Sequence, residues 1–575
     1  MCLLVEELKR LKKSSQDAVD NETSFNDFKK YMHVHRQVED GLIDAIQCAK
    51  KSSRKSLVLV CGNVGDGKSH LISYLKHHEN NYLDGFIIHN DATESLSRNR
   101  NEREELARVL SDFSDSNIDS AVGTKIIIAI NLGVLSNFLS SEEGKCFTKL
   151  AEYVEKNKIL VDTEISFSNN KEDEIFFNVN FGDYHIYRLN EGKIDSPYIS
   201  EFIDKIFSDN IGNTFYDAYR SCHICDVCDC CPVKSNYEMM SSQTVKTGIT
   251  NIILETVIKD KIILSTRELL DFFYDIIVHP EYNKTKYKNH YKKNKLKSFI
   301  EYSLPSIMYK HNEVSTLLAH IKQYDFISLR SELFDNIITK FNITDEPVEI
   351  FEQYLENNSC LKFILSNAFE IHESDKEELS QFLARMCKVT SKNGQIETID
   401  REFNEFVSYL YYARKGDVKC LKQLYTTVMK CVSFWNGGNG ENLNLNTNHE
   451  DYVISTSLDY QPDASCFNNV YNETIFERFP TYINLTFMSK KDSSQKASVS
   501  IDYDLYNILK KVENGYRPSV KDSNSFAGFV SFIKKLSDFG NQNEEITVCH
   551  YVGDSIKEYT LKKDVFDTYE FKEVK

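Results

Sequence analysis

The chain has 575 residues, 41% of them hydrophobic and 27% charged, which is an ordinary globular composition and allows roughly three to five domains. Its net charge of −17 argues against a general nucleic-acid coat, because phosphate binding needs concentrated positive charge, but leaves room for a local DNA-contacting patch. No run of about 18 apolar residues occurs, which argues against a transmembrane helix and a membrane partner.

Residues 1–55 predict an N-terminal helical segment. The opening stretch, MCLLVEELKRLKKSSQDAVD, has an apolar run too short for a secretory signal, and its basic residues follow that run rather than precede it. We therefore expect an amphipathic helix and a cytoplasmic location. In a reducing compartment, stable disulfides are not expected.

Residues 56–280 predict an α/β domain with a parallel sheet. Short apolar strands alternate there with helical patterns, and three such runs are SLVLVCG, GFIIHND and KIIIAIN. The fold class that we expect is α/β, with this domain followed by an α-helical region and a mixed α/β C-terminal domain.

The stretch LVLVCGNVGDGKSHLISYL predicts a nucleotide-binding loop. It fits the pattern G-x-x-x-x-G-K-[ST] without a mismatch, with a buried-type strand before the loop and an apolar helical face after it. Glycines let successive N–H groups point at one phosphate, aided by the helix N-terminus. Lys68 would bridge the β- and γ-phosphates of ATP, and Ser69 would hold Mg²⁺. The predicted binding residues are Gly62, Asn63, Val64, Gly65, Asp66, Gly67, Lys68, Ser69 and His70. We therefore expect residues 56–280 to form a P-loop NTPase domain.

Whether ATP is hydrolysed depends on a carboxylate that the sequence does not identify clearly. P-loop ATPases normally end a neighbouring strand with a magnesium-facing Asp. The run KIIIAIN ends instead in Asn131, which cannot supply that charge. Asp91, after the run GFIIHND, is our first choice, and Asp183 is the alternative. A polar turn at Asn90 and Asp91 would explain the same residues.

A cysteine-rich excursion at about residues 215–245 predicts a metal site. Cys222, Cys225, Cys228 and Cys231 follow at three-residue steps, with Pro232 next. Thiolates gathered so closely need a neutralising cation, either a structural zinc ion or an iron–sulfur cluster. Redox-sensing thiols and a partly disulfide-bonded turn stay open. The segment also contains an extra thiol and an alternative ligand, Cys230 and His223.

Two further segments carry functional candidates. In ILSTRELLDFFYDII, Ser265 and Glu268 form a capping box that fixes a helix start and leaves Arg267 in the first turn. Arg267 could act there as a γ-phosphate sensor or finger, or pair with a surface carboxylate. Residues 283–297 carry seven lysines interleaved with Tyr287 and other aromatic residues. They predict either contacts to DNA, with tyrosines stacked on bases, or a solvated interdomain loop.

The rest of the chain predicts two more domains. Residues 281–435 show helical periodicity, and the stretch NGGNGENLNLNTN then predicts a linker. Within residues 436–575, YINLTFM alternates like a strand. The stretch ITVCHYVGDSIKEYTL resembles a hairpin that turns at Gly553 and Asp554, and two amphipathic helices are expected between these elements.

The segments GNVGDGKSHLISYL, IIIAINLGVLSNF and CPVKSNY, within about residues 62–237, together resemble the DptF family. These are P-loop ATPase-like subunits of the bacterial restriction system that acts on DNA lacking phosphorothioate modification. The resemblance implies an ATP-binding subunit that works with DptG-like and DptH-like partners. It assigns a mechanistic role only to the motif residues, Gly62, Gly67, Lys68 and Ser69, and it supplies no hydrolytic carboxylate.

Two other functions remain open. The chain could be a nucleotide-bound scaffold that does not hydrolyse ATP, which Asn131 favours, or a regulatory NTPase without a DNA role. No nuclease-like acidic cluster occurs, so we expect DNA cleavage to belong to another subunit. DNA is an expected partner, through either direct or indirect contact.

Overall fold

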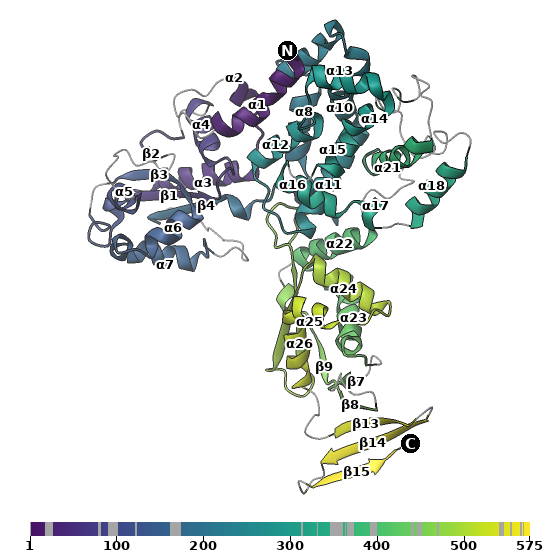
Figure 1. Cartoon of the computed structure of the whole chain (residues 1–575). Helices are drawn as coiled ribbons and strands as arrows, with labels where there is room; N and C mark the ends of the chain where they lie inside the picture. The colour runs from purple at the N-terminus through teal and green to yellow at the C-terminus, as the bar shows by residue number, and fades with distance from the viewer. Residues whose placement is uncertain are drawn as a thin grey trace. The chain divides into compact units, whose positions relative to one another are not determined.

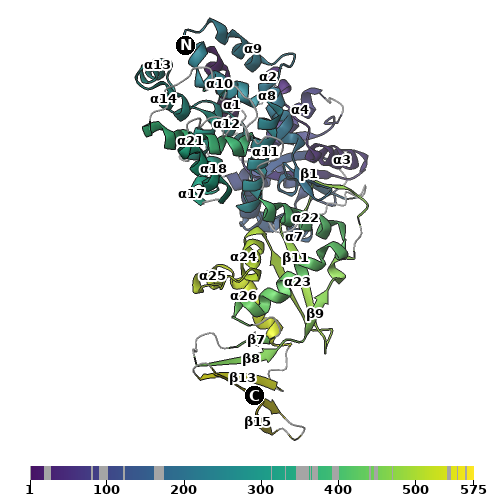
Figure 2. The same ribbon diagram turned by 90° about the vertical axis from the view of Figure 1, so that its right-hand side faces the viewer.

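The computed structural model describes residues 2–17, 27–78, 82–89, 102–120, 123–160, 174–311, 314–329, 332–344, 360, 362, 364, 373–390, 400–438, 442–445, 451–468, 471–539, 545–552, 555–563, 566 and 568–574. The chain forms two compact units (Figure 1, Figure 2). The first unit comprises Met1–Arg188 and Asp195–Ile399, and the second comprises Leu189–Ile194 and Asp400–Lys575. The predicted boundaries at residues 55, 280 and 435 remain predictions.

A four-stranded parallel sheet forms one core of the first unit. Its strands lie in the order β2-β3-β1-β4. They are β1 (Ser56–Gly62), β2 (Ile87–His89), β3 (Lys125–Asn131) and β4 (Phe176–Asn180). The parallel sheet and its first three strands confirm the sequence-based prediction, whereas β4 was not predicted.

Helices cover both faces of this sheet, which explains the uninterrupted apolar runs of its central strands (Figure 1). Along β1, Leu57, Leu59 and Cys61 pack with one set of helices, and Val58 and Val60 pack with the other. The first set is α5 (Glu102–Val109), α6 (Leu132–Leu139) and α7 (Thr148–Lys156), and the second is α3 (Gln37–Lys51) and α4 (Lys68–His78). The predicted α/β layer is therefore a three-layer arrangement.

Within the described residues, the rest of the first unit is largely helical. Strands of the parallel sheet end at Asn180, so the alternation expected as far as residue 280 stops earlier. The remaining helices are α1 (Leu3–Asp17), α2 (Asp27–Tyr31), α8 (Pro197–Phe207), α9 (Thr214–Arg220), α10 (Pro232–Met240), α11 (Gln243–Lys259), α12 (Thr266–Ile277), α13 (Lys284–Lys293), α14 (Lys295–Glu301), α15 (Leu304–Lys310), α16 (Thr316–Gln323), α17 (Phe326–Leu329), α18 (Glu332–Ile343) and α21 (Glu373–Val389). Short 3-10 turns are η1 (Ser111–Phe113), η2 (Glu143–Cys146), η3 (Phe181–Asp183), η4 (Ser221–Ile224) and η5 (Cys228–Cys230).

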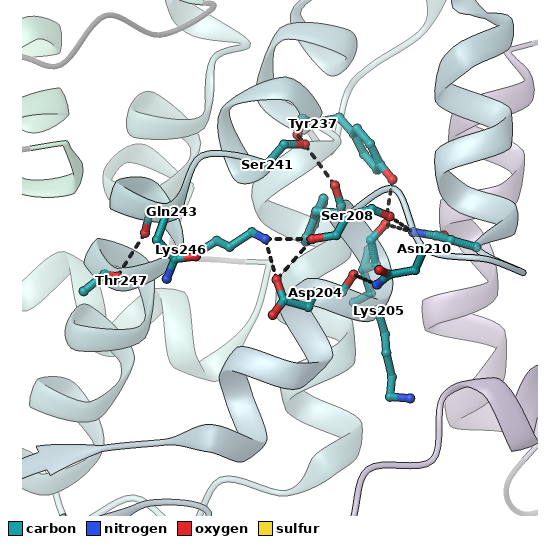
Figure 3. Close-up of polar contacts among 12 residues, drawn as sticks. Asp204, Lys205, Ser208, Asn210, Tyr237, Ser241, Gln243, Lys246 and Thr247 are labelled. Atoms are coloured by element: carbon teal, nitrogen blue, oxygen red, sulfur yellow. Dashed lines mark hydrogen bonds and ion pairs between the residues drawn. The ribbon is translucent and has the colours of Figure 1, made fainter.

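A polar network fixes the carboxyl end of α8 against α10 and α11 (Figure 3). Lys246, on α11, is buried; it pairs with the Asp204 carboxylate and donates to Ser208 Oγ at 2.8 Å. The Tyr237 hydroxyl donates to the Ile206 carbonyl oxygen at 2.6 Å. A side chain thus satisfies a carbonyl group that the end of a helix leaves unpaired. The residues of this network flank the cysteines in the sequence.

The second unit combines helices with antiparallel sheets. Its helices are α22 (Arg401–Lys415), α23 (Val418–Trp435), α24 (Tyr503–Glu513), α25 (Val520–Ser525) and α26 (Ala527–Ser537), with η7 (Ser465–Phe467). Its strands are β5 (Arg188–Asn190), β6 (Lys193–Asp195), β7 (Asn442–Asn444), β8 (Tyr452–Ser457), β9 (Tyr460–Asp463), β10 (Ile475–Phe476), β11 (Ile483–Ser489), β12 (Lys496–Ile501), β13 (Glu545–Val552), β14 (Ser555–Lys563) and β15 (Tyr569–Glu573). The strand orders are β10-β5-β6, β12-β11-β9 and β15-β14-β13-β8-β7.

Several predictions for residues 436–575 can be compared with this unit. The strand at YINLTFM is β11, with Ile483, Leu485 and Phe487 buried on one face. The predicted hairpin is β13–β14, which pair in antiparallel fashion, while its turn at Gly553 and Asp554 lies outside the described residues. Three helices, rather than two, lie between them in the described chain. The predicted linker contains β7, because its Asn-Leu-Asn run pairs with β8.

No helix in the described ranges is both long enough and apolar enough to cross a membrane. This agrees with the absence of long apolar runs in the sequence.

Candidate functional site

The loop between β1 and α4 has the strand–loop–helix geometry that its motif predicts. β1 ends at Gly62, and α4 begins at Lys68. Gly65 and Gly67 have φ angles of +88° and +95°, which residues with a Cβ rarely adopt. The Leu71 N–H donates to the Gly67 carbonyl oxygen at 2.9 Å, so the helix starts directly after the loop. The N-terminal end of α4 therefore faces this turn, where its dipole favours an anion.

Lys68 is buried at the mouth of the loop, with only 8% of its surface exposed. Its Nζ donates to the carbonyl oxygens of Gly62 and Asn63, at 3.0 and 2.6 Å. It also donates to Asn131 Oδ1 at 3.0 Å. Asn131 ends β3 and pairs in register with Gly62. The ends of two adjacent strands thus hold one ammonium group beside the loop.

Asp66 braces the loop from inside. Its Oδ2 accepts the Asn63 N–H at 2.6 Å, and its side chain is buried. Burial raises the pKa of Asp66 above its usual value, while the Asn63 N–H and the charges of Lys68 and Arg36 act in the opposite direction. The carboxylate therefore closes a turn within the loop at some desolvation cost.

The N-terminus of α12 lies against this loop and brings Arg267 to it. The predicted capping box is present: Ser265 Oγ accepts the Glu268 N–H at 3.2 Å, and the Glu268 carboxylate accepts the Ser265 N–H at 2.9 Å. A Cβ added at Gly65 would lie 3.3 Å from Ser265 Oγ and 3.5 Å from Arg267 Cβ. Arg267 Nε is buried and has no hydrogen-bond partner within the described chain. Such an orphaned donor beside the loop suits an anionic ligand.

Arg36 is a site residue that the sequence did not indicate. Its guanidinium donates to the carbonyl oxygens of Asp66, at 3.3 Å, and Tyr184, at 3.0 Å. It also lies 5.2 Å from the centre of the Tyr198 ring. Arg36 precedes α3 in a short connection without a motif, so only the tertiary structure reveals that the N-terminal segment contacts the loop.

Of the two candidate carboxylates, Asp91 and Asp183, the structure describes only Asp183. Asp91 lies outside the described residues and remains a prediction. Asp183 is buried in η3, directly after β4, and its Oδ1 accepts from Asn180 Nδ2 at 3.4 Å. Because β4 adjoins β1, Asp183 lies at the same edge of the sheet as the loop, but it takes part in the local turn that ends β4.

His70 contacts the N-terminal segment rather than standing alone at the loop. Its Nε2 lies 3.2 Å from Nδ1 of His33, whose ring stacks on Tyr74 with centroids 3.5 Å apart. Burial, with additional effects of His33 and Lys29, lowers the pKa of His70 to about 4. A neutral His70 therefore helps to attach α4 to the segment before α3, and its predicted contact with nucleotide remains a prediction.

The cysteine segment consists of short turns between α9 and α10. Cys222 lies on η4, Cys228 on η5, and Cys231 caps α10. Burial, followed by the neighbouring thiols of Cys231 and Cys2, raises the pKa of Cys222 to about 12. The structure therefore places these cysteines in one segment of short turns that ends at the start of α10.

The cysteines of this segment have no covalent partner in the structure, and two of their thiols contact neighbouring side chains. None of its five cysteines forms a disulfide, which argues against the disulfide-bonded turn. Among the described residues, no group of three or more His, Cys, Asp or Glu side chains is arranged to hold a metal ion. Lys234 Nζ donates to Cys228 Sγ at 3.4 Å, and the Tyr282 hydroxyl lies 3.5 Å from Cys231 Sγ. His223 Nδ1 lies 2.7 Å from the Arg220 carbonyl oxygen.

The lysine-rich stretch is helical and partly packs on the cysteine segment. Residues 283–297 form α13 and α14, so the interpretation as a solvated loop is wrong. Tyr287 is fully buried and donates to the Cys230 carbonyl oxygen at 2.7 Å, so it is not available to stack on a base. Lys284 and Lys288 pair with Asp226 and lower its pKa. The lysines that remain exposed are Lys286, Lys292, Lys293, Lys295 and Lys297.

Comparisons with protein-family models, curated proteins and solved structures found no match. A functional interpretation of the site therefore rests on its residues, their geometry and the motif resemblance described above.

Proposed function

We propose that the chain is the ATP-binding subunit of a bacterial multi-protein restriction complex that acts on DNA lacking phosphorothioate modification. The observation that carries the proposal is the placement of Lys68 at the loop between β1 and α4, next to Asn131. The three segments that resemble the DptF family support the choice of system. In this proposal the first unit contains a P-loop NTPase domain, DptG-like and DptH-like subunits are the partners, and the protein is cytoplasmic.

The residues around the loop fit a nucleoside triphosphate with Mg²⁺. Backbone N–H groups of the loop and of the α4 N-terminus would bind the phosphates, and Lys68 would neutralise their charge. Ser69, the next residue on α4, would hold the magnesium ion. Arg267, whose Nε is buried and unpaired in the described structure, would take a phosphate oxygen as its acceptor.

The proposal extends to ATP hydrolysis, for which β3 ends in an amide, Asn131, rather than a carboxylate. We keep Asp91 as the proposed carboxylate, because it follows β2, the strand next to β3. The second candidate function is a scaffold that binds nucleotide without hydrolysing it. Asn131 favours this alternative, since a neutral amide stands where a neighbouring strand normally provides a magnesium ligand.

The cysteine segment is proposed to hold a structural zinc ion or an iron–sulfur cluster. Its donor set fits by chemistry, because soft thiolate ligands select these metals. The described side chains are not arranged as a ligand group, so no step of the proposed function depends on the metal.

The decisive experiment is restriction in cells that carry the modification and restriction genes. We expect Lys68→Ala to admit unmodified plasmid while the wild-type chain excludes it, with modified plasmid entering both strains. Lys76→Ala is the matched control, because Lys76 is exposed on the same helix. Equal soluble protein and loss of ATP binding by purified Lys68→Ala must accompany the result. If Lys68→Ala excludes unmodified plasmid as well as wild type does, nucleotide use is not coupled to restriction.

A further inference from the structure

Among the described strands, β15 forms an open edge of the five-stranded sheet in the second unit. It pairs with β14 on one side and is the last strand in the order β15-β14-β13-β8-β7 (Figure 1, Figure 2). All five of its residues are exposed, and Tyr569 and Phe571 are 64% and 57% exposed. An open strand edge presents unpaired backbone donors and acceptors, which is a template for pairing with another strand.

The sheet also has one apolar face that reaches this edge. Residues directly opposite in an antiparallel pair point to the same face. The register therefore aligns Ile454, Val548 and Tyr559 in one row, which ends at Glu573 on β15, and Ile546, Leu561 and Phe571 in the next. Tyr559 and Phe571 stack with ring centroids 5.0 Å apart, which confirms their common face. Phe571 and Glu573 are exposed, and the other side chains of the two rows are partly exposed.

The backbone of β15 fixes which residues can pair across the open edge. The Val574 N–H donates to the Glu558 carbonyl oxygen of β14 at 2.8 Å. Because backbone groups alternate in direction along a strand, residues 570 and 572 also point toward β14. The N–H and C=O groups of Tyr569, Phe571 and Glu573 consequently point to the open edge.

We propose that β15 pairs with β15 of a second copy of this chain, in an antiparallel register centred on Phe571. This register places Phe571 opposite Phe571 of the other copy and Tyr569 opposite Glu573, which are the residues whose backbone groups face outward. It also places Glu570 opposite Lys572, twice per dimer. Opposite charges in directly opposed positions stabilise an antiparallel pair, and aromatic pairs do so as well.

Neighbouring registers are disfavoured by charge. Moving the centre of the pairing by one residue in one direction places Glu570 opposite Glu570, and moving it in the other direction places Lys572 opposite Lys572. Like charges that are directly opposed destabilise a strand pair. The two-fold axis is perpendicular to the sheet, so the apolar faces of the two copies join into one continuous surface. The sequence of β15 is therefore complementary to β15 of a second copy of the chain.

The test is a charge exchange measured on the full-length chain. The molar mass is determined by sedimentation equilibrium over a range of protein concentrations. We expect wild type to dimerise and Glu570→Lys to weaken dimerisation by at least about tenfold, because the substitution opposes two positive charges at each Glu570–Lys572 pair. The double variant Glu570→Lys with Lys572→Glu is expected to restore dimerisation. Glu558→Lys, on the neighbouring strand β14, is the matched control and should leave it unchanged.

Two results would overturn the proposal. One is a wild-type chain that stays monomeric at every concentration, including the case in which β15 binds a different protein. The other is a dimer that Glu570→Lys leaves intact or that the double variant fails to restore. A circular dichroism spectrum like that of wild type excludes global misfolding. Restoration by the double variant excludes loss of the β14–β15 pairing as the cause, because both variants place a lysine opposite Lys562 of β14. Nucleotide binding plays no part in this test, so its outcome is independent of the proposed function.

Discussion

Lys68 and Asn131 are joined by a hydrogen bond of 3.0 Å, from the lysine Nζ to the amide Oδ1, although they are 63 positions apart in the sequence. The contact follows from the register of the parallel sheet, which aligns the last residue of β1 with the last residue of β3. It ties the loop lysine to the adjacent strand end through a neutral amide. Asn131 itself supplies no negative charge at the end of β3.

Asp91→Asn is expected to reduce ATP turnover at least about tenfold, since it removes the charge proposed to orient Mg²⁺, as one removed catalytic interaction typically does. ATP binding measured without Mg²⁺ should stay unchanged. Asp183→Asn is the matched control, because Asp183 already takes part in the turn after β4. Steady-state ATPase assays with purified variants, with and without partner subunits and DNA, provide the measurement. If Asp183→Asn lost turnover and Asp91→Asn did not, the catalytic carboxylate would be Asp183, in the turn after β4.

Asp66→Ala is expected to weaken ATP binding about tenfold, because loss of one hydrogen bond within the loop costs about 1 to 1.5 kcal/mol. Asp66→Asn keeps an acceptor for the Asn63 N–H and should bind within a few-fold of wild type. Isothermal titration calorimetry with ATP compares the three proteins. Equal affinities for Asp66→Ala and wild type would show that the loop does not need this brace.

Replacing Cys225 and Cys228 by serine is expected to lower both the metal content and the Tm, because metal binding to thiolates contributes folding free energy. Cys230→Ser is the matched control, since Cys230 falls outside the three-residue spacing of the other four. Elemental analysis of the purified proteins and thermal unfolding provide the two readings. A double variant with wild-type metal content and Tm would contradict a structural metal in this segment.

We expect the free energy of unfolding to depend on pH through the buried carboxyl group of Asp275. It is buried on α12 and pairs with Lys12 of α1 at 2.8 Å, and burial raises its pKa to about 6. The folded state therefore binds this proton more tightly than the unfolded state, whose Asp has a pKa of about 3.9. The contribution is fully present below about pH 4 and is lost as the pH rises through 6, by at most about 3 kcal/mol.

Asp275→Asn removes this titration, so its stability relative to wild type should increase between about pH 4 and pH 7. Groups that titrate identically in both proteins cancel in the comparison. Thermal unfolding of the two proteins in matched buffers across this range provides the measurement. A difference in Tm that stays constant with pH would rule out Asp275 as the titrating group.

The sequence by itself determined the features that depend on neighbours in the chain. The phosphate-loop motif, with glycines at 65 and 67 that adopt positive φ, became the turn between β1 and α4. The capping box of Ser265 and Glu268 lies at the start of α12, and β13 pairs with β14 where the sequence shows two strand patterns. Such features form from interactions over a few residues, so local patterns are sufficient to predict them.

The tertiary structure decided what depends on packing between distant segments. The sheet register places Asn131 within hydrogen-bond distance of Lys68. The fold places Arg36 against the loop, although no sequence motif indicates this contact. Tyr287 became a buried support of the cysteine segment, because α13 packs on turns that lie more than fifty residues earlier in the chain. The open edge at β15 likewise exists only because the order of the described strands leaves it at the end of the sheet. Burial and long-range pairing depend on which surfaces meet, and composition and periodicity do not specify that partner.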